Sequence, residues 1–147
     1  GRSGNAHPNI YPYDSFATGT TPVFLAVGND RQFRLLCEHL GCPQLVADER
    51  FATAGQRSHH RDALKPLLEQ ALQSCDGPAL ADALMAIGVP AAPVLGVDAA
   101  LNHPHTLHRE MVVEMEGGYR GLGAPVKLSR TPASYRHAPL AEGDSFE

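Results

Sequence analysis

The chain has 147 residues, 43% of them hydrophobic, which is enough for one domain with its own core. Twelve Lys and Arg residues against sixteen Asp and Glu give a formal charge of -4, and no long basic run occurs, so we expect neither a nucleic-acid-binding nor an anionic-membrane surface. The longest apolar stretches are far shorter than the roughly 18 residues that span a bilayer, so no membrane helix is expected.

The first predicted element is a buried strand that follows an irregular N-terminal segment. Residues 1–13 are rich in Gly, Asn and Pro and are expected to form a loop. Residues 20–27 form an apolar, β-branched run between Gly19 and Gly28, a pattern typical of a buried strand.

The next segment carries the signals of an amphipathic helix over residues 30–40. Asn29 is suited to cap its N-terminus, and Gln32 follows at the spacing of a capping box. Apolar residues recur at helical spacing, namely Phe33, Leu36, Cys37 and Leu40. Gly41 ends the pattern. Because Cys37 lies on the apolar stripe, we expect its thiol to pack as a core residue.

Two further helices are predicted. Residues 58–74 are amphipathic, but Pro66 lies inside the pattern and predicts a kink or a late start. Residues 78–87 begin with Pro78, a favoured first helical residue, and end before Gly88.

The last third of the chain is predicted to be mostly extended. Residues 91–97 are apolar and interrupted by a proline, which favours an edge strand. Asp98 is expected to cap a short helix. Residues 111–128 contain the Gly117-Gly118 pair and predict a β-hairpin. Strands and helices in this order indicate an α+β fold, and no composition shift marks a second domain, so a single domain is expected over the whole chain.

Two local patterns were weighed as ligand sites. The glycine-rich residues 117–123 match neither the dinucleotide-binding pattern nor the phosphate loop of NTPases, so a hairpin turn is favoured. His103, His105 and His108 stand close together, but Pro104 separates the first two and no Cys is near. We therefore expect solvated or capping histidines and no metal site.

Charged residues at two helix starts have more than one interpretation. His59-His60, between Arg57 and Arg61, is expected to be an exposed helix start, although such a cationic cluster can meet a phosphate. Asp30 stands in the first turn of a helix directly after a strand, a position that suits a functional group in a crevice. Stabilisation of the helix dipole explains Asp30 without any ligand and is the favoured interpretation.

The cysteines indicate the cellular compartment, and the N-terminus indicates whether the chain is part of a longer protein. Cys37, Cys42 and Cys75 are odd in number and lack a C-x-x-C pair, which argues against a disulfide framework and against zinc. A reducing compartment, the cytoplasm, is expected. The chain begins at Gly1 without a methionine or a signal peptide, so we expect it to be a piece of a longer protein.

Six phrases stand in order along nearly the whole chain. They are G-N-x-H-P at residues 4–8, P-Y-D-x-F at 12–16, L-A-V-G-N-D-R-Q-F at 25–33, D-E-R-F-A-T at 48–53 followed by Arg57, G-V-P-A-A-P-V at 88–94, and G-A-P-V-K-L-S at 123–129. Together they closely resemble the class III CoA-transferases, the family of L-carnitine dehydratase, bile-acid-inducible proteins, formyl-CoA transferase and α-methylacyl-CoA racemase.

The resemblance implies that residues 1–147 are the small domain of such an enzyme, with helices packed on a short, mostly antiparallel sheet. It implies a coenzyme A thioester as substrate, no covalently bound cofactor, and three kinds of partner: the large CoA-binding domain of the same enzyme, acyl-CoA with a carboxylic acid, and a second copy in a homodimer. In the transferases an aspartate of the large domain carries the acyl group. No position here matches that motif, so we expect no catalytic residue in this chain and no activity of the chain alone.

The resemblance also implies two groups of site residues. Residues 4–9 resemble a loop that closes over the active site, although the consecutive glycines of formyl-CoA transferase are absent. Asp30 aligns with a glutamate that supports a catalytic histidine in the racemase branch, and the turn at residues 88–94 is expected to line the same cleft. The candidates are therefore Gly4, Asn5, His7 and Pro8 for the lid, and Asp30, Val89, Pro90 and Ala91 for the cleft.

Three functions remain open from the sequence. The leading one is part of an acyl-CoA transferase that moves CoA between carboxylic acids, with this chain supplying a lid, a wall of the acyl pocket and dimer contacts. The alternative enzyme is an α-methylacyl-CoA racemase or epimerase, which works by acid/base proton transfer; the Asn29-Asp30 phrase favours the transferase. An alternative of another class is a free-standing domain that binds acyl-CoA without catalysis.

Overall fold

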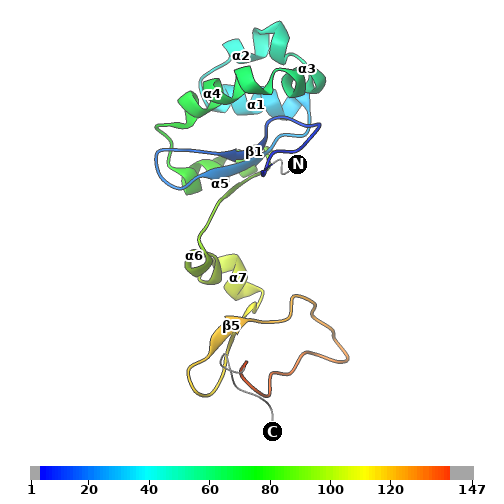
Figure 1. The fold of residues 1–147 in the computed structure, drawn as a ribbon, viewed down its shortest axis with the longest axis vertical. Helices are drawn as coiled ribbons and strands as arrows, with labels where there is room; N and C mark the ends of the chain where they lie inside the picture. Colours follow the sequence, from blue (N-terminus) through cyan, green and yellow to red (C-terminus); the bar gives the residue numbers. More distant parts are fainter. Residues whose placement is uncertain (1–3, 140–147) are drawn as a thin grey trace. The chain divides into compact units, whose positions relative to one another are not determined.

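The computed structural model describes residues 4–139. The chain forms two compact units, residues 1–94 and residues 95–147, which are taken in turn below (Figure 1). The single domain expected over residues 1–147 stays a prediction. None of the helices in the described range is long and apolar enough to cross a membrane.

The first unit is built on a three-stranded antiparallel sheet. Its strands are β1 (Tyr13–Phe16), β2 (Val23–Ala26) and β3 (Ala91–Pro93), in the order β1-β2-β3. β2 is the predicted buried strand, shortened to Val23–Ala26, and β3 is the predicted edge strand or extended segment. β1 begins at the last residue of the segment predicted to be a loop. Its polar Asp14 and Ser15 give no strand pattern in the sequence, and it becomes a strand through pairing with β2.

Helices cover this sheet. They are α1 (Asp30–His39), α2 (Gln44–Ala47), the 3₁₀ turn η1 (Glu49–Phe51), α3 (Ala54–His59), α4 (Arg61–Leu72) and α5 (Gly77–Ala86). The predicted start of α1 is confirmed, because the Asn29 side chain accepts a hydrogen bond from Gln32 N at 2.9 Å. The reciprocal bond of the capping box falls one residue earlier than predicted: Gln32 Oε1 accepts from Gly28 N at 2.8 Å.

The single helix predicted over residues 58–74 is wrong. Two helices occupy this stretch, because His60 ends α3 with a non-helical backbone and α4 begins at Arg61. Thr53 caps α3 through Gln56 N, so α3 begins at Ala54, four residues before the predicted start. Pro66 is accommodated inside α4, with its side chain exposed.

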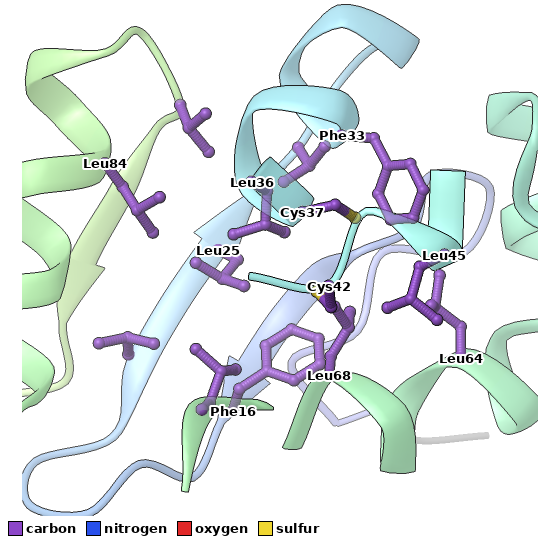
Figure 2. Packing of buried hydrophobic residues seen from close by; sticks show 14 of the residues in the cluster. Phe16, Leu25, Phe33, Leu36, Cys37, Cys42, Leu45, Leu64, Leu68 and Leu84 are labelled. Atoms are coloured by element: carbon purple, nitrogen blue, oxygen red, sulfur yellow. The ribbon is translucent and has the colours of Figure 1, made fainter. Parts of the chain in front are cut away.

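The hydrophobic core belongs to the first unit. All buried hydrophobic residues that the structure describes lie between Tyr11 and Val89 (Figure 2). β2 contributes Val23 and Leu25, and α4 contributes a stripe of leucines, namely Leu64, Leu68 and Leu72. Cys37 is fully buried in this cluster, as predicted.

The second unit consists of two short helices and a hairpin. They are α6 (Val97–Leu101), α7 (Pro104–His108), β4 (Val112–Glu114) and β5 (Arg120–Leu122), and β4 and β5 pair antiparallel around the predicted glycine turn. Both turn glycines have positive φ angles, +85° for Gly117 and +81° for Gly118. The cap predicted for Asp98 is wrong, because this residue lies in the first turn of α6 and Gly96 is the cap.

Candidate functional site

Three segments converge at one end of the sheet in the first unit. β1 begins where β2 ends, with Tyr13 opposite Ala26, and β3 begins there too, with Ala91 opposite Leu25. Because both neighbours run antiparallel to β2, the loop before β1, the start of α1 after β2 and the turn before β3 leave the sheet at the same end. The sheet end thus gathers the residues singled out as lid and cleft candidates.

Backbone hydrogen bonds extend the sheet beyond the strands at this end. Val27 N donates to Pro12 O at 3.0 Å, and Ala26 N donates to Pro90 O at 3.0 Å. The Gln32 side chain links the start of α1 to the turn before β3: its Nε2 donates to Gly88 O at 3.4 Å, and its Oε1 accepts from the backbone N–H of Gly28. The three segments are therefore held together by directional bonds rather than by proximity alone.

The loop of residues 4–9 is organised around the His7 side chain. His7 Nδ1 accepts hydrogen bonds from Asn9 N and Ile10 N, both at 3.1 Å. The backbone N–H of His7 donates to Tyr13 O at 2.9 Å, and the two rings lie 5.2 Å apart. Hydrogen bonds thus fix the part of the loop at His7, where it joins the segment before β1.

Arg61 ties this loop to α4. Its guanidinium donates to His7 O at 3.2 Å and to Pro8 O at 2.7 Å, and it lies 5.7 Å from the centre of the Tyr11 ring. Gly4 and Asn5 are exposed, and Gly4 has a φ of +63°. Residues 7 and 8 are therefore anchored, whereas residues 4 and 5 have no comparable clamp among the contacts of the described chain.

The Asp30 carboxylate is bound to Arg57. The Nη2 atom of Arg57 donates to Asp30 Oδ1 at 2.7 Å, and the side chain of Arg57 is fully buried while that of Asp30 is 52% exposed. Arg57 also donates to Tyr11 O at 3.2 Å and to Phe51 O at 3.0 Å, and its guanidinium lies 4.5 Å from the centre of the Phe33 ring. Arg57, which precedes the predicted exposed helix start at His59-His60, is itself buried, and three acceptors compensate the burial of its charge.

This pair changes the interpretation of Asp30. The helix-dipole role is retained, since Asp30 is the first residue of α1. The carboxylate is also the counter-ion of a buried cation, a role that sequence reasoning missed. The signal available was the position of Arg57 four residues after the phrase at residues 48–53, but no local pattern indicates that a guanidinium in α3 turns inward.

The turn before β3 divides into buried and accessible residues. Val89 is fully buried in the core, so its side chain is turned away from solvent. Pro90 is exposed and Ala91 half-buried. Of this group, Pro90 is the accessible residue, whereas Ala91 packs against the core, and the roles of all eight candidates stay predictions.

Tyr11 follows the loop of residues 4–9 in the chain and is 2% exposed. Burial, with a further contribution from the Asp14 carboxylate, raises the pKa of its hydroxyl well above the ordinary value of 10.0, so the phenol stays neutral. In the part of the chain that the structure describes, its Oη is the buried side-chain polar atom that lacks a hydrogen-bond partner. Tyr11 is therefore a structural element of the site, not a proton donor to it.

Within residues 4–139, no three His, Cys, Asp or Glu side chains are grouped so that they could hold a metal ion. In the second unit, His103 Nδ1 accepts from His105 N at 3.2 Å and caps α7. The capping role expected for these histidines is confirmed for His103.

Comparison with known proteins explains why the six sequence phrases occur in this order along the chain. The family model "CoA-transferase family III" matches residues 1–145. An acetyl-CoA:oxalate CoA-transferase from Acetobacter aceti is 39% identical over 87% of this chain and 33% of its own length, and a succinate–glutarate CoA-transferase from Agrobacterium fabrum is 34% identical over 91% of this chain and 34% of its own.

A solved structure agrees with the sequence comparisons. The crystal structure of a CaiB/BaiF family protein from Brucella suis matches with a TM-score of 0.82 and 38% identity, over 89% of this chain and 34% of that one. The chain thus spans about a third of the length of the relatives it matches. The family match extends over nearly every residue, so the chain belongs to CoA-transferase family III.

Proposed function

We propose that this chain is part of an acyl-CoA transferase that moves CoA between carboxylic acids. The match of residues 1–145 to the family carries the proposal. The substrate is then a coenzyme A thioester, and no covalently bound cofactor is needed. All three cysteines are free thiols, which fits the reducing cytoplasm proposed as its location.

The sheet end of the first unit serves as a wall and lid of the acyl site. Its support is the convergence of the lid loop, Asp30 and the turn before β3, held by the backbone bonds of Pro12 and Pro90. Arg61 holds the root of the lid, and Arg57 fixes the orientation of the Asp30 carboxylate. The nucleophile comes from the large domain outside this chain, so the isolated chain has no transferase activity.

The second unit supplies contacts to other parts of the enzyme. Val97 is 79% exposed and Leu122 69% exposed, and with Leu101 and Met111 they line a mostly apolar depression of about 330 Å³. Exposed apolar surface of this kind is typical of a face covered by a partner. The large domain of the same polypeptide, or a second copy in a homodimer, covers it.

The acceptor acid is a small dicarboxylic acid. Oxalate, succinate and glutarate appear in the names of the two similar transferases, and all three carry a second carboxylate. The test uses the longer polypeptide that contains this chain, with acetyl-CoA or succinyl-CoA as donor. We expect CoA esters of oxalate or glutarate to form, and pentanoate, which matches the length of glutarate but has one carboxylate, to react at least tenfold more slowly.

Other outcomes would identify the alternatives. Solvent deuterium that enters the α-carbon of an acyl-CoA without exchange of CoA between acids indicates a racemase or epimerase and contradicts the transferase. If the native polypeptide in the source cells has only the 15.7 kDa of this chain and binds acyl-CoA with micromolar affinity in calorimetry, the free-standing binding domain is correct instead.

The lid role has its own test in the longer enzyme. Arg61→Ala removes the two bonds to the carbonyls of His7 and Pro8. If the loop shields a reactive acyl intermediate from water, hydrolysis of the acyl-CoA donor rises relative to transfer by roughly tenfold. Arg50→Ala, an exposed arginine paired with Asp48, is the control and leaves the ratio unchanged. An unchanged ratio in Arg61→Ala contradicts the lid.

A further inference from the structure

Two cysteines occupy the paired positions of the turn that ends α1. Cys42 N donates to Cys37 O at 2.9 Å and Gly41 N donates to Glu38 O at 3.2 Å, and Gly41 has a φ of +67°. This is the hydrogen-bond pattern of a Schellman motif. An apolar contact between the first and the last residue of such a motif commonly accompanies it, and here both residues carry a thiol.

The motif brings the two residues within reach of a covalent bond. Standard bond lengths limit Cα atoms joined through one N–H···O=C bond to roughly 6.8 Å, the upper end of the range that disulfides span. The two thiols are neighbours, since each is the largest cause of the shift in the other's pKa. Figure 2 shows both within the hydrophobic cluster, Cys37 on α1 and Cys42 on the segment that leads to α2.

The two thiols differ in access and in acidity. A surface depression of about 280 Å³ reaches Cys42, which is 6% exposed, and its lining does not include Cys37, which is fully buried. The neighbouring Cys37 side chain lowers the pKa of the Cys42 thiol, while the Cys42 side chain and burial raise the pKa of the Cys37 thiol. Cys42 is thus the more accessible and the more reactive sulfur.

We propose that Cys37 and Cys42 form a peroxide-sensitive dithiol that closes reversibly to a disulfide. The Cys42 thiolate attacks one oxygen of hydrogen peroxide, the O–O bond breaks, and the leaving hydroxide takes a proton to become water. The Cys37 sulfur then attacks the resulting sulfenic acid, an S–S bond forms, the S–O bond breaks, and a second water leaves. Two thiols are oxidised and one peroxide is reduced, and a thiol reductant reverses the change.

The test treats the full 147-residue chain with hydrogen peroxide and maps its thiols. We expect two of the three thiols to be lost, with a mass decrease of two hydrogens confined to residues 35–50, the tryptic peptide that holds both cysteines. Cleavage after Glu38, which lies between Cys37 and Cys42, leaves two pieces that stay joined until a reductant is added. Cys75→Ser is the matched control and behaves as the wild type.

Single variants separate the roles of the two sulfurs. Cys37→Ala stops the reaction at a sulfenic acid on Cys42, which dimedone traps, whereas Cys42→Ala gives neither disulfide nor trapped acid at Cys37. Three results in the wild type would overturn the proposal: sulfinic acid at Cys42 without a disulfide, a disulfide that includes Cys75, or oxidation of Cys75 while residues 35–50 keep their mass. None of these readouts depends on transferase activity.

Discussion

Arg57 is a buried charge that links four segments through three hydrogen bonds and an aromatic contact. The guanidinium binds the carbonyl of Tyr11 before β1, the carbonyl of Phe51 in η1 and the carboxylate of Asp30 at the start of α1. A planar fork with five N–H groups suits this geometry, and a lysine ammonium does not.

Arg57→Lys tests this linkage. The charge is kept, but at least one of the three acceptors loses its donor in a buried setting, so we expect the free energy of unfolding to fall by about 2 to 4 kcal/mol. Urea unfolding followed by circular dichroism measures the change. Arg50→Lys is the control, because its ion pair with Asp48 is exposed and contributes less than about 1 kcal/mol. Equal effects of the two substitutions would contradict the argument.

Tyr11 gives a prediction of the opposite sign. Tyr11→Phe removes a buried hydroxyl without a hydrogen-bond partner, so we expect the free energy of unfolding to rise by about 1 kcal/mol. Tyr13→Phe, at a half-buried tyrosine, should change it by less than about 0.5 kcal/mol. A loss of stability in Tyr11→Phe would mean that the hydroxyl is bonded in solution.

The same residue predicts a pH dependence. The folded state raises the pKa of Tyr11 above its ordinary value of 10.0, so the unfolded chain releases this proton at a lower pH than the folded chain does. The wild type therefore loses stability as the pH rises above 10, and Tyr11→Phe lacks that part of the loss. Urea midpoints at pH 8 and pH 11 measure the difference, and parallel declines in the two proteins would contradict it.

At the scale of elements, substitution of two helical glycines distinguishes the effect of close packing on stability from the effect of helix propensity. Gly77 begins α5, and a Cβ built there overlaps the backbone oxygen of Thr21, whereas a Cβ built on Gly55 in α3 meets nothing within 4 Å. Gly77→Ala should destabilise the fold by about 2 kcal/mol, because backbone must move. Gly55→Ala should stabilise it by about 0.5 kcal/mol through helix propensity. Thermal unfolding compares the pair, and two changes of the same sign would contradict the packing argument.

Elements with complete local signals were predictable. α1 has a cap, an apolar stripe and a glycine stop in adjacent residues, and the hairpin of the second unit has its glycine turn. β1 was not predictable, because its residues become a strand only through pairing with β2. The break between α3 and α4 is likewise not marked in the sequence, because the apolar stripe begins only at Leu64 and no glycine or proline stands at His60.

At the scale of the whole molecule, the core is confined to one unit. Every buried hydrophobic residue in the described chain lies before residue 90, while Val97, Leu107 and Leu122 of the second unit are largely exposed. We expect a chain that ends at Val94 to unfold in one cooperative urea transition, and residues 95–147 alone to show none. Far-ultraviolet circular dichroism measures both, and loss of cooperativity in residues 1–94 would show that the core needs the second unit.

The sequence by itself determined the family, the α+β class, the cap and stripe of α1 and the glycine hairpin, since each depends on residues that are adjacent or in fixed order along the chain. Only the tertiary structure decided that Arg57 is buried against Asp30, 27 residues away, and against Tyr11, 46 residues away. It also decided that the loop of residues 4–9, Asp30 and Pro90 meet at one end of the sheet. Strand pairing and compensation of a buried charge join residues that no local pattern links, so these features arise only when the chain has folded.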